Sequence, residues 1–189
     1  MPTRNAYQNR LAGKYTRLEQ VKRVLWMFGI VLFKLSPRPC FSFRCRLLRL
    51  FGAKVGHNVH VYPSAIIYFP WNLEIGGWSA IGEWSLVYNL GRVKIGENAT
   101  VSQRVHICAG THDYQDSSMP LIKSSVTIGD SVWVCADAFI GPSVTIHEGA
   151  VVGACSVVVK DVTAWTVVAG NPARFIKFRR MNESGSESL

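Results

Sequence analysis

Charged residues, long apolar runs and metal-type cysteine pairs are all scarce in this sequence. Charged side chains make up 17% of the 189 residues and apolar residues 48%, which is typical of a globular protein and not of a disordered one. The longest apolar run, residues 24–33, is ten residues long, whereas a helix needs about 20 to span a bilayer. The composition therefore favours one globular domain without a membrane-spanning helix.

The five cysteines are not arranged as metal ligands. None of them forms a Cys-x-x-Cys pair, which is the usual spacing in a zinc site. The first twenty residues are polar and do not have the pattern of a secretory signal peptide. We therefore expect free thiols in a reducing cytoplasm and no bound metal.

Acidic residues are almost absent from the first 54 residues. This segment holds twelve Lys and Arg and a single acid, Glu19, so it accounts for the net charge of +9. A basic arm favours an anionic partner, either a membrane surface or a nucleic acid. No nucleic-acid-binding module is present. We therefore expect either peripheral contact with an anionic membrane at its inner face or a purely structural arm.

A six-residue repeat of aliphatic residues dominates the rest of the chain. The repeated residues are Val55, Val61, Ile67, Ile75, Ile81, Val87, Ile95, Val101, Ile107, Ile128, Val134, Ile140, Ile146, Val152 and Val158. This period predicts a parallel β-helix in which each aliphatic side chain points inward and three steps close one coil. Glycine often follows the aliphatic residue, and we expect it to relax the backbone at the bend.

The repeat is interrupted at only one of its three phases. The step lengthens after Ile67, Val87 and Ile107, each the third aliphatic residue of its coil, and the last interruption inserts the loop 108–126. All three extra segments therefore leave the solenoid at the same corner. Insertions stacked in this way commonly form the binding face of a repeat protein.

We expect the solenoid over residues 55–170. Helices are predicted before and after it in the sequence. Thr16 and Glu19 fit a capping box that opens a helix. Its apolar stripe consists of Leu18, Val21, Leu25, Phe28 and Leu32. With a second helix over residues 43–51, the segment 1–54 would cap the first coil or lie on a membrane. The segment 171–189 is expected to contain a short basic helix over residues 173–181 and a loose polar tail.

The inserted loop contains the best candidate for a catalytic residue. It carries Gly110-Thr-His-Asp-Tyr114, so His112 is the one histidine outside the repeats. Imidazole is the side chain best suited to accept a proton near neutral pH. We therefore interpret His112 as a general base. Asp116 or another subunit, rather than the adjacent Asp113, is expected to orient its ring.

Five segments carry a resemblance to a known family. They are Phe69-Pro-Trp-Asn-Leu-Glu-Ile-Gly76, Tyr88-Asn-Leu-Gly91, Gly110-Thr-His-Asp-Tyr114, Val126-Thr-Ile-Gly-Asp-Ser-Val-Trp133 and Val167-Val-Ala-Gly-Asn-Pro-Ala-Arg174. Through them the chain resembles the hexapeptide-repeat O-acetyltransferases, the galactoside, maltose and serine acetyltransferase superfamily. The match is closest to the colanic-acid-biosynthesis branch, which Ser36-Pro-Arg-Pro39 and Leu47-Leu-Arg-Leu-Phe-Gly-Ala-Lys54 also resemble, so it covers nearly the whole chain.

The resemblance implies an all-β fold, a left-handed parallel β-helix, that assembles as a homotrimer with active sites between subunits. It implies acetyl-CoA as the donor, and as acceptor a sugar hydroxyl of a cell-surface polysaccharide or its lipid-linked precursor. By the same resemblance His112 is the base, and the backbone N–H of Ala136 holds the oxyanion. The implied acceptor-binding residues are Asn89, Asp113 and Tyr114. The implied coenzyme A-binding residues are Trp133, Ala136, Ala154, Arg174 and Lys177.

Other functions remain open at this point. The solenoid could be a non-catalytic scaffold, although the loop with His112 argues against it. It could also acetylate another small hydroxyl acceptor such as an antibiotic or serine, which no sequence feature excludes. A γ-class carbonic anhydrase shares the fold but needs three histidine ligands to a metal. The histidines within the repeats, His57, His60, His106 and His147, do not reproduce that arrangement.

Overall fold

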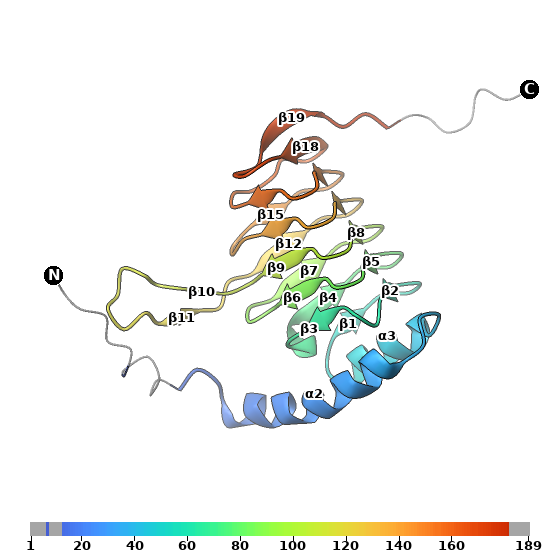
Figure 1. Cartoon of the computed structure of the whole chain (residues 1–189), viewed down its shortest axis with the longest axis vertical. Coiled ribbons are helices and arrows are strands. Elements are labelled where there is room, and N and C mark those ends of the chain that lie inside the picture. The colour runs from blue at the N-terminus through green and yellow to red at the C-terminus, as the bar shows by residue number, and fades with distance from the viewer. Residues whose placement is uncertain (1–6, 8–12, 182–189) are drawn as a thin grey trace, which may run out of the picture.

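Three sheets of parallel strands form the three faces of a solenoid, and two helices lie across its first coil (Figure 1). The computed structural model describes residue 7 and residues 13–181; the tail expected over residues 182–189 lies outside the described residues, as does most of residues 1–12. Helix α2 spans Arg17–Leu35 and helix α3 spans Phe41–Leu50.

Each face of the solenoid is one sheet of short strands. The first sheet contains β1 (Lys54–Val55), β4 (Leu73–Ile75), β7 (Val93–Ile95), β12 (Val126–Ile128) and β15 (Thr145–Ile146). The second contains β2 (His60–Val61), β5 (Ala80–Ile81), β8 (Thr100–Val101), β13 (Trp133–Val134), β16 (Val151–Val152), β18 (Thr166–Ala169) and β19 (Arg174–Phe178). The third contains β3 (Ile66–Ile67), β6 (Leu86–Tyr88), β9 (His106–Cys108), β14 (Phe139–Ile140) and β17 (Val157–Val158).

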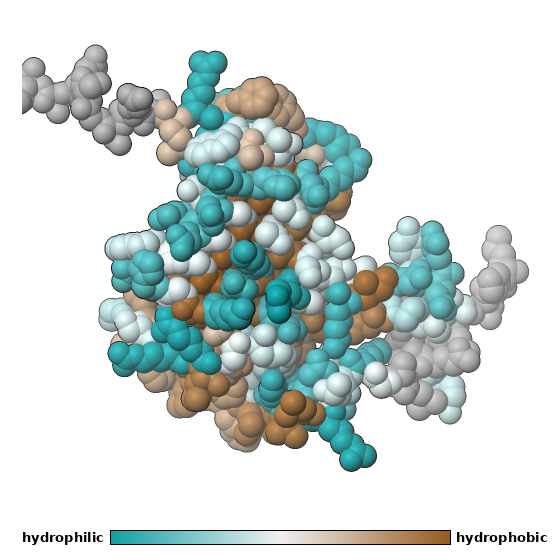
Figure 2. Space-filling model, turned by 180° about the vertical axis from the view of Figure 1, so that it is seen from behind, coloured by the Kyte–Doolittle hydropathy of each residue, from teal (hydrophilic) through white to brown (hydrophobic). Residues whose placement is uncertain are grey.

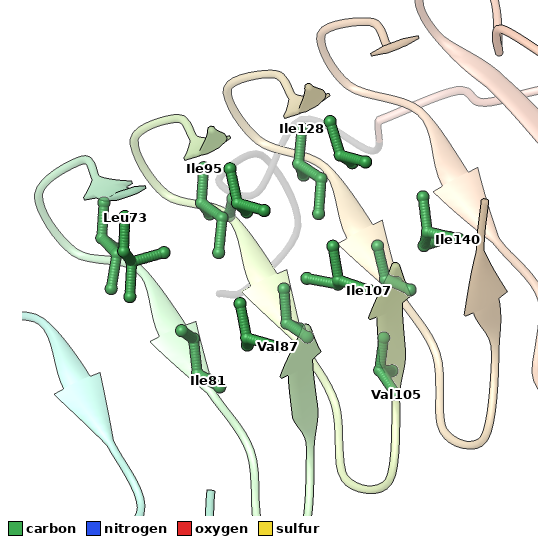
Figure 3. Close-up of a cluster of buried hydrophobic side chains, with 14 of the residues drawn as sticks. Leu73, Ile81, Val87, Ile95, Val105, Ile107, Ile128 and Ile140 are labelled. Atoms are coloured by element: carbon green, nitrogen blue, oxygen red, sulfur yellow. The ribbon is translucent and has the colours of Figure 1, made fainter. Parts of the chain in front are cut away.

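The strand register confirms the six-residue repeat and its three phases. In the first sheet Val55 lies beside Ile75, which lies beside Ile95, and Ile95 lies beside Ile128. The other two sheets align their aliphatic residues in the same way. The inward side chains therefore stack in columns (Figure 3). Burying one such side chain contributes about 1.5–3 kcal/mol, so the columns are the main source of stability.

The corners of the coils use a residue with positive φ, three positions after the inward aliphatic residue. Trp78, Asn98 and Ser131 have φ values of 59°, 54° and 55°. Gly76 has no positive φ, and a Cβ atom there would lie 2.5 Å from the backbone nitrogen of Glu97. The expectation that these glycines relax the backbone at the bend is therefore wrong, because the residues with positive φ are others. They let successive coils approach closely.

The two helices cover the open end of the first coil, which confirms the predicted cap. Helix α2 begins with the predicted capping box of Thr16 and Glu19. Its side chains Trp26 and Phe33 are buried against the solenoid. The indole Nε1 of Trp26 donates a hydrogen bond of 2.8 Å to the carbonyl oxygen of Ile67, so the helix is fixed to the edge of β3.

The predicted apolar stripe of α2 faces away from the solenoid. Leu18, Val21, Leu25, Phe28 and Leu32 are all more than half exposed, and Phe28 is 71% exposed. Of the two expected positions of this stripe, on the first coil or on a membrane, the first does not occur in the single chain. Figure 2 shows apolar side chains gathered at the helical end of the molecule. Neither helix in the described part of the chain has the length and apolarity required to cross a bilayer.

The C-terminal segment is a strand and not the predicted short helix. Strand β19 pairs antiparallel with β18, with Val167 opposite Lys177. The chain reverses at Gly170, whose φ is 99°. Without β19, the backbone groups along the edge of β18 would have no partners. Pairing with this edge therefore outweighs the helical tendency of the isolated segment.

Arg44 of α3 joins the helical cap to the first coil. Its side chain is fully buried and donates to the carbonyl oxygens of Val61 at 2.6 Å, Pro37 at 2.8 Å and Arg38 at 2.6 Å. Burial lowers the pKa of the guanidinium, but arginine stays charged at neutral pH. No carboxylate within residues 13–181 pairs with it, so backbone dipoles stabilise the charge.

Replacing Arg44 by Met should lower the free energy of unfolding by about 1–3 kcal/mol for each buried carbonyl oxygen that loses its donor. The matched control is Arg46→Met on the exposed side of the same helix, which should change the free energy of unfolding by less than about 0.5 kcal/mol. Urea unfolding measures both variants. Equal losses for the two variants would show that Arg44 does not anchor the cap.

Candidate active site

A hairpin outside the solenoid carries the candidate base. Strands β10 (Thr111–His112) and β11 (Leu121–Ile122) pair antiparallel, with His112 opposite Leu121 (Figure 1). The hairpin leaves after β9 and returns at β12, so it lies at the predicted corner between the third and first sheets. Lys123 Nζ lies 3.2 Å from Glu19 Oε1 of α2. This ion pair joins the returning arm of the hairpin to the helical cap.

The ring of His112 is oriented by a backbone carbonyl. Its Nδ1 lies 2.7 Å from the carbonyl oxygen of Met119. Because a carbonyl oxygen can only accept, Nδ1 carries the hydrogen and Nε2 keeps its lone pair. Met119 has a φ of 47°, a left-handed conformation in the turn that aims this carbonyl at the ring. The arrangement leaves the lone pair of Nε2 available.

Neither aspartate of the loop contacts His112. Asp116 Oδ1 accepts hydrogen bonds from the backbone nitrogen and hydroxyl of Ser118, and Asp113 Oδ1 accepts from the backbone nitrogen of Gln115. These bonds stabilise the hairpin turn. The expectation that Asp116 orients the ring is therefore wrong, because the Met119 carbonyl does so. Tyr114 is 82% exposed at the hairpin tip.

Asn89, which the resemblance implies as an acceptor-binding residue, does not project from the corner at which the three interruptions leave the solenoid. Its side chain is fully buried. Its Oδ1 accepts from the backbone nitrogen of Phe69 at 3.0 Å, and its Nδ2 donates to the Phe69 carbonyl oxygen at 2.6 Å. Asn72 Nδ2 donates to the carbonyl oxygens of Asn89 and Leu90. Both asparagines replace backbone ladder bonds where the coil is interrupted, so they fix the shape of the corner.

The residues implied for coenzyme A lie together on the second sheet. The register places Trp133 beside Val151, Val151 beside Val167, and Val167 beside Lys177. This row crosses three strand spacings, about 14 Å. The Trp133 ring is 48% exposed, and its Nε1 donates to the Ser102 hydroxyl at 3.0 Å. The row is therefore an outward-facing strip with an aromatic ring at one end and a cation at the other.

Ala136 and Ala154 lie at the corner next to this strip. They occupy equivalent positions in successive coils, and the Ala136 carbonyl oxygen accepts from the backbone nitrogen of Cys155 at 2.9 Å. The flanking nitrogens of Cys135 and Asp137 donate to the ladder. The N–H of Ala136 has no acceptor within residues 13–181. It remains available to a ligand at this corner.

One chain does not bring the two groups of residues together. His112 leaves the solenoid between the third and first sheets, whereas Ala136, Ala154 and the strip lie on the second sheet and at its corner with the third. The third sheet separates the two groups. The strip ends at β19, where Arg174 and Lys177 are exposed.

Sequence comparisons relate the chain to known transferases. A family model described as bacterial transferase hexapeptide (six repeats) matches residues 125–160. WcaF of Escherichia coli (strain K12), provisionally named a colanic acid biosynthesis acetyltransferase, is 39% identical over 154 residues, 82% of this chain and 85% of WcaF. The galactoside O-acetyltransferase of the same organism is 30% identical over 135 residues, 69% of this chain and 66% of that protein.

Solved structures have the same fold. A maltose O-acetyltransferase from Clostridium difficile 630 superposes with a TM-score of 0.79 and 27% identity, over 88% of this chain and 90% of that one. A galactoside acetyltransferase in complex with coenzyme A gives a TM-score of 0.80 and 25% identity over 92% of both chains. Fold and sequence relatives thus define a transferase built on a hexapeptide solenoid. The chain belongs to the hexapeptide-repeat acetyltransferase family.

The sequence interpretation missed the group that orients the base. The carbonyl of Met119 belongs to the backbone, so no side-chain pattern marks it. The nearest signal is Gly110-Thr-His-Asp-Tyr114, which predicts a loop with a histidine but not the hairpin pairing of His112 with Leu121.

Proposed function

We propose that this protein transfers the acetyl group of acetyl-CoA to a sugar hydroxyl of a cell-surface polysaccharide or its precursor. The observation that carries the proposal is the His112 ring, held by the Met119 carbonyl with Nε2 free to accept a proton. Support comes from relatives named as acetyltransferases and from a structural relative solved with coenzyme A.

The chemistry follows from the orientation of the ring. His112 Nε2 takes the proton of the acceptor hydroxyl as its oxygen attacks the thioester carbonyl carbon. The tetrahedral intermediate then collapses, the C–S bond breaks, and the coenzyme A thiolate leaves. The proton held by the imidazolium passes to that sulfur, so the base is restored. The products are the sugar acetate ester and free coenzyme A.

Residues on the second sheet are proposed to hold the donor. The Ala136 N–H would donate to the oxyanion, because a preformed donor stabilises the charge that develops there. The apolar arm of coenzyme A would lie along Ala154 and the strip from Trp133. Arg174 and Lys177 would meet its phosphates through charged hydrogen bonds. Asp113 and Tyr114 remain candidates for acceptor contacts, whereas the saturated hydrogen bonds of Asn89 give it a supporting role.

A homotrimer would complete the site. The hairpin and the donor strip lie at different corners of one chain, so a hairpin from one subunit must meet the strip of the next. A closed ring of identical subunits repeats this contact at every interface. The acceptor and donor residues of each site would then come from two subunits.

The helical end of the molecule is proposed to contact an anionic membrane at the cytoplasmic face. The exposed stripe of α2 offers apolar side chains, and Arg17 and Lys34 are exposed at the two ends of the helix. A wide apolar face with flanking cations is typical of helices that lie in the membrane interface. This contact would keep the enzyme near a lipid-linked acceptor.

Replacing His112 by Ala should lower kcat by roughly 10²–10⁴-fold, because the general base is lost. The affinity for acetyl-CoA should stay within about three-fold, since the donor residues lie on another sheet. Release of free coenzyme A thiol measures turnover with a sugar acceptor. The matched control is His147→Ala, an exposed histidine within the repeats, which should keep wild-type turnover. Wild-type turnover in His112→Ala would disprove the assignment.

Mixing two inactive variants tests the shared site. His112→Ala lacks the base, and Ala154→Trp fills the exposed donor corner. If each site uses two subunits, randomly mixed trimers should recover about a quarter of wild-type activity. If both groups come from one subunit, the mixture stays as inactive as its components. Full activity of Ala154→Trp alone would refute the donor assignment.

Vesicles containing phosphatidylglycerol should bind the protein at low salt and release it as salt rises, because each basic residue near the surface contributes about 1 kcal/mol. Leu25→Gln with Phe28→Gln should weaken binding at least ten-fold, since each apolar side chain contributes about 1.5–3 kcal/mol on burial. Co-sedimentation measures binding, with phosphatidylcholine vesicles as the control. Unchanged binding, or a changed trimer mass, would instead mark the stripe as a contact between subunits.

A further inference from the structure

An apolar groove lies between helix α2 and strand β3. Its volume is about 490 Å³, within the range of about 300–1,000 Å³ found for ligand pockets. Val24, Met27 and Ile30 line it from the helix, and Ile66 and Tyr68 line it from the solenoid. Val24 and Met27 are more than half exposed, so the groove is open along one side. Packing of the cap leaves this space unfilled.

One end of the groove carries a cation without an acidic partner. The Arg23 guanidinium lies 4.2 Å from the ring centroid of Tyr15 and 5.8 Å from that of Phe69. No carboxylate within residues 13–181 pairs with it. Lys123 also lies over Tyr15, at 5.2 Å, but its ammonium is paired with Glu19. The groove therefore ends at one guanidinium that is free to bind an anion.

This basic end is next to the hairpin with the candidate base. Lys123 follows Leu121 by two residues, and Leu121 lies opposite His112. On the solenoid, the rings of Tyr68 and Tyr88 are 5.0 Å apart, and Tyr88 lies beside Cys108, where the hairpin insertion begins. A ligand that extends from the groove past Arg23 thus reaches the base of the hairpin.

We infer that the groove binds the apolar chain of a lipid-linked sugar phosphate, with its phosphate on Arg23 and its sugar directed toward His112. The inference rests on the proposed function, because it takes His112 as the end at which the sugar reacts. Charge complementarity selects this occupant over a second copy of the chain. In a two-fold contact of this end with its own copy, two basic segments would face each other, because the first 54 residues contain twelve Lys and Arg and one acid.

Calorimetry with farnesyl monophosphate, below its micelle concentration, tests the site without turnover. The intact protein should bind it, and farnesol or Arg23→Gln should bind about ten-fold more weakly, because a charged hydrogen bond is lost. Val24→Gln with Met27→Gln should weaken binding at least ten-fold. The matched control is Leu25→Gln with Phe28→Gln, which has the same spacing on the outer face of the helix and should bind as the wild type does.

Several outcomes would overturn the inference. They are no binding of farnesyl monophosphate, equal losses for the two double variants, and equal affinity for dihexanoyl phosphatidylglycerol, which would indicate a general lipid surface. A changed oligomer mass in Val24→Gln with Met27→Gln would show that a second copy fills the groove. His112→Ala should bind the probe normally. Failure of the probe to bind would therefore not contradict the proposed catalysis. Wild-type turnover in His112→Ala would contradict the catalysis but not the binding of the probe.

Discussion

The hydrogen-bond ladder between successive coils is the constraint on which the rest of the structure depends. The backbone nitrogen of Gly76 donates to the carbonyl oxygen of Ile95, and that of Gly96 donates to Ile128. These bonds stay in register only if every face contributes the same number of residues to every coil. An extra residue must therefore leave at a corner. The three interruptions consequently lie at one corner of the solenoid. Side chains on these inserted segments are not required for the core.

The same ladder leaves the first coil with an exposed apolar cross-section, and the chain closes it at a cost. The cap uses Trp26 and Phe33 of α2 and the buried cation of Arg44. Because α2 is apolar around much of its circumference, closing the coil with one face leaves a second apolar face exposed. The groove and the outer stripe both result from this surplus. A helix that only capped the solenoid would carry polar residues on that face.

The sequence predicts the parts of the structure that depend on side-chain period. The aliphatic columns, the capping box of α2 and the corner of insertion all follow from spacing alone. The packed face of α2 does not, because residues 24–33 are all apolar, so their spacing does not distinguish the side that packs from the predicted stripe. Strand β19 exists only because the edge of β18 needs partners. The partners of His112 and Asn89 are backbone groups, which no residue pattern marks.

The proposed site combines a part that each chain organises alone with a part that would depend on assembly. The His112 ring is fixed within its own hairpin, and the hairpin is joined to the cap by the pair of Lys123 and Glu19. The donor strip is equally fixed, because it belongs to the ladder of the second sheet. Because the two groups are separated on one chain, the proposed mechanism requires a contact between subunits to bring base and donor into line. Since misplacement by about 1 Å can cost about a hundred-fold in rate, activity should depend on the geometry of the interface more than on the stability of the isolated chain.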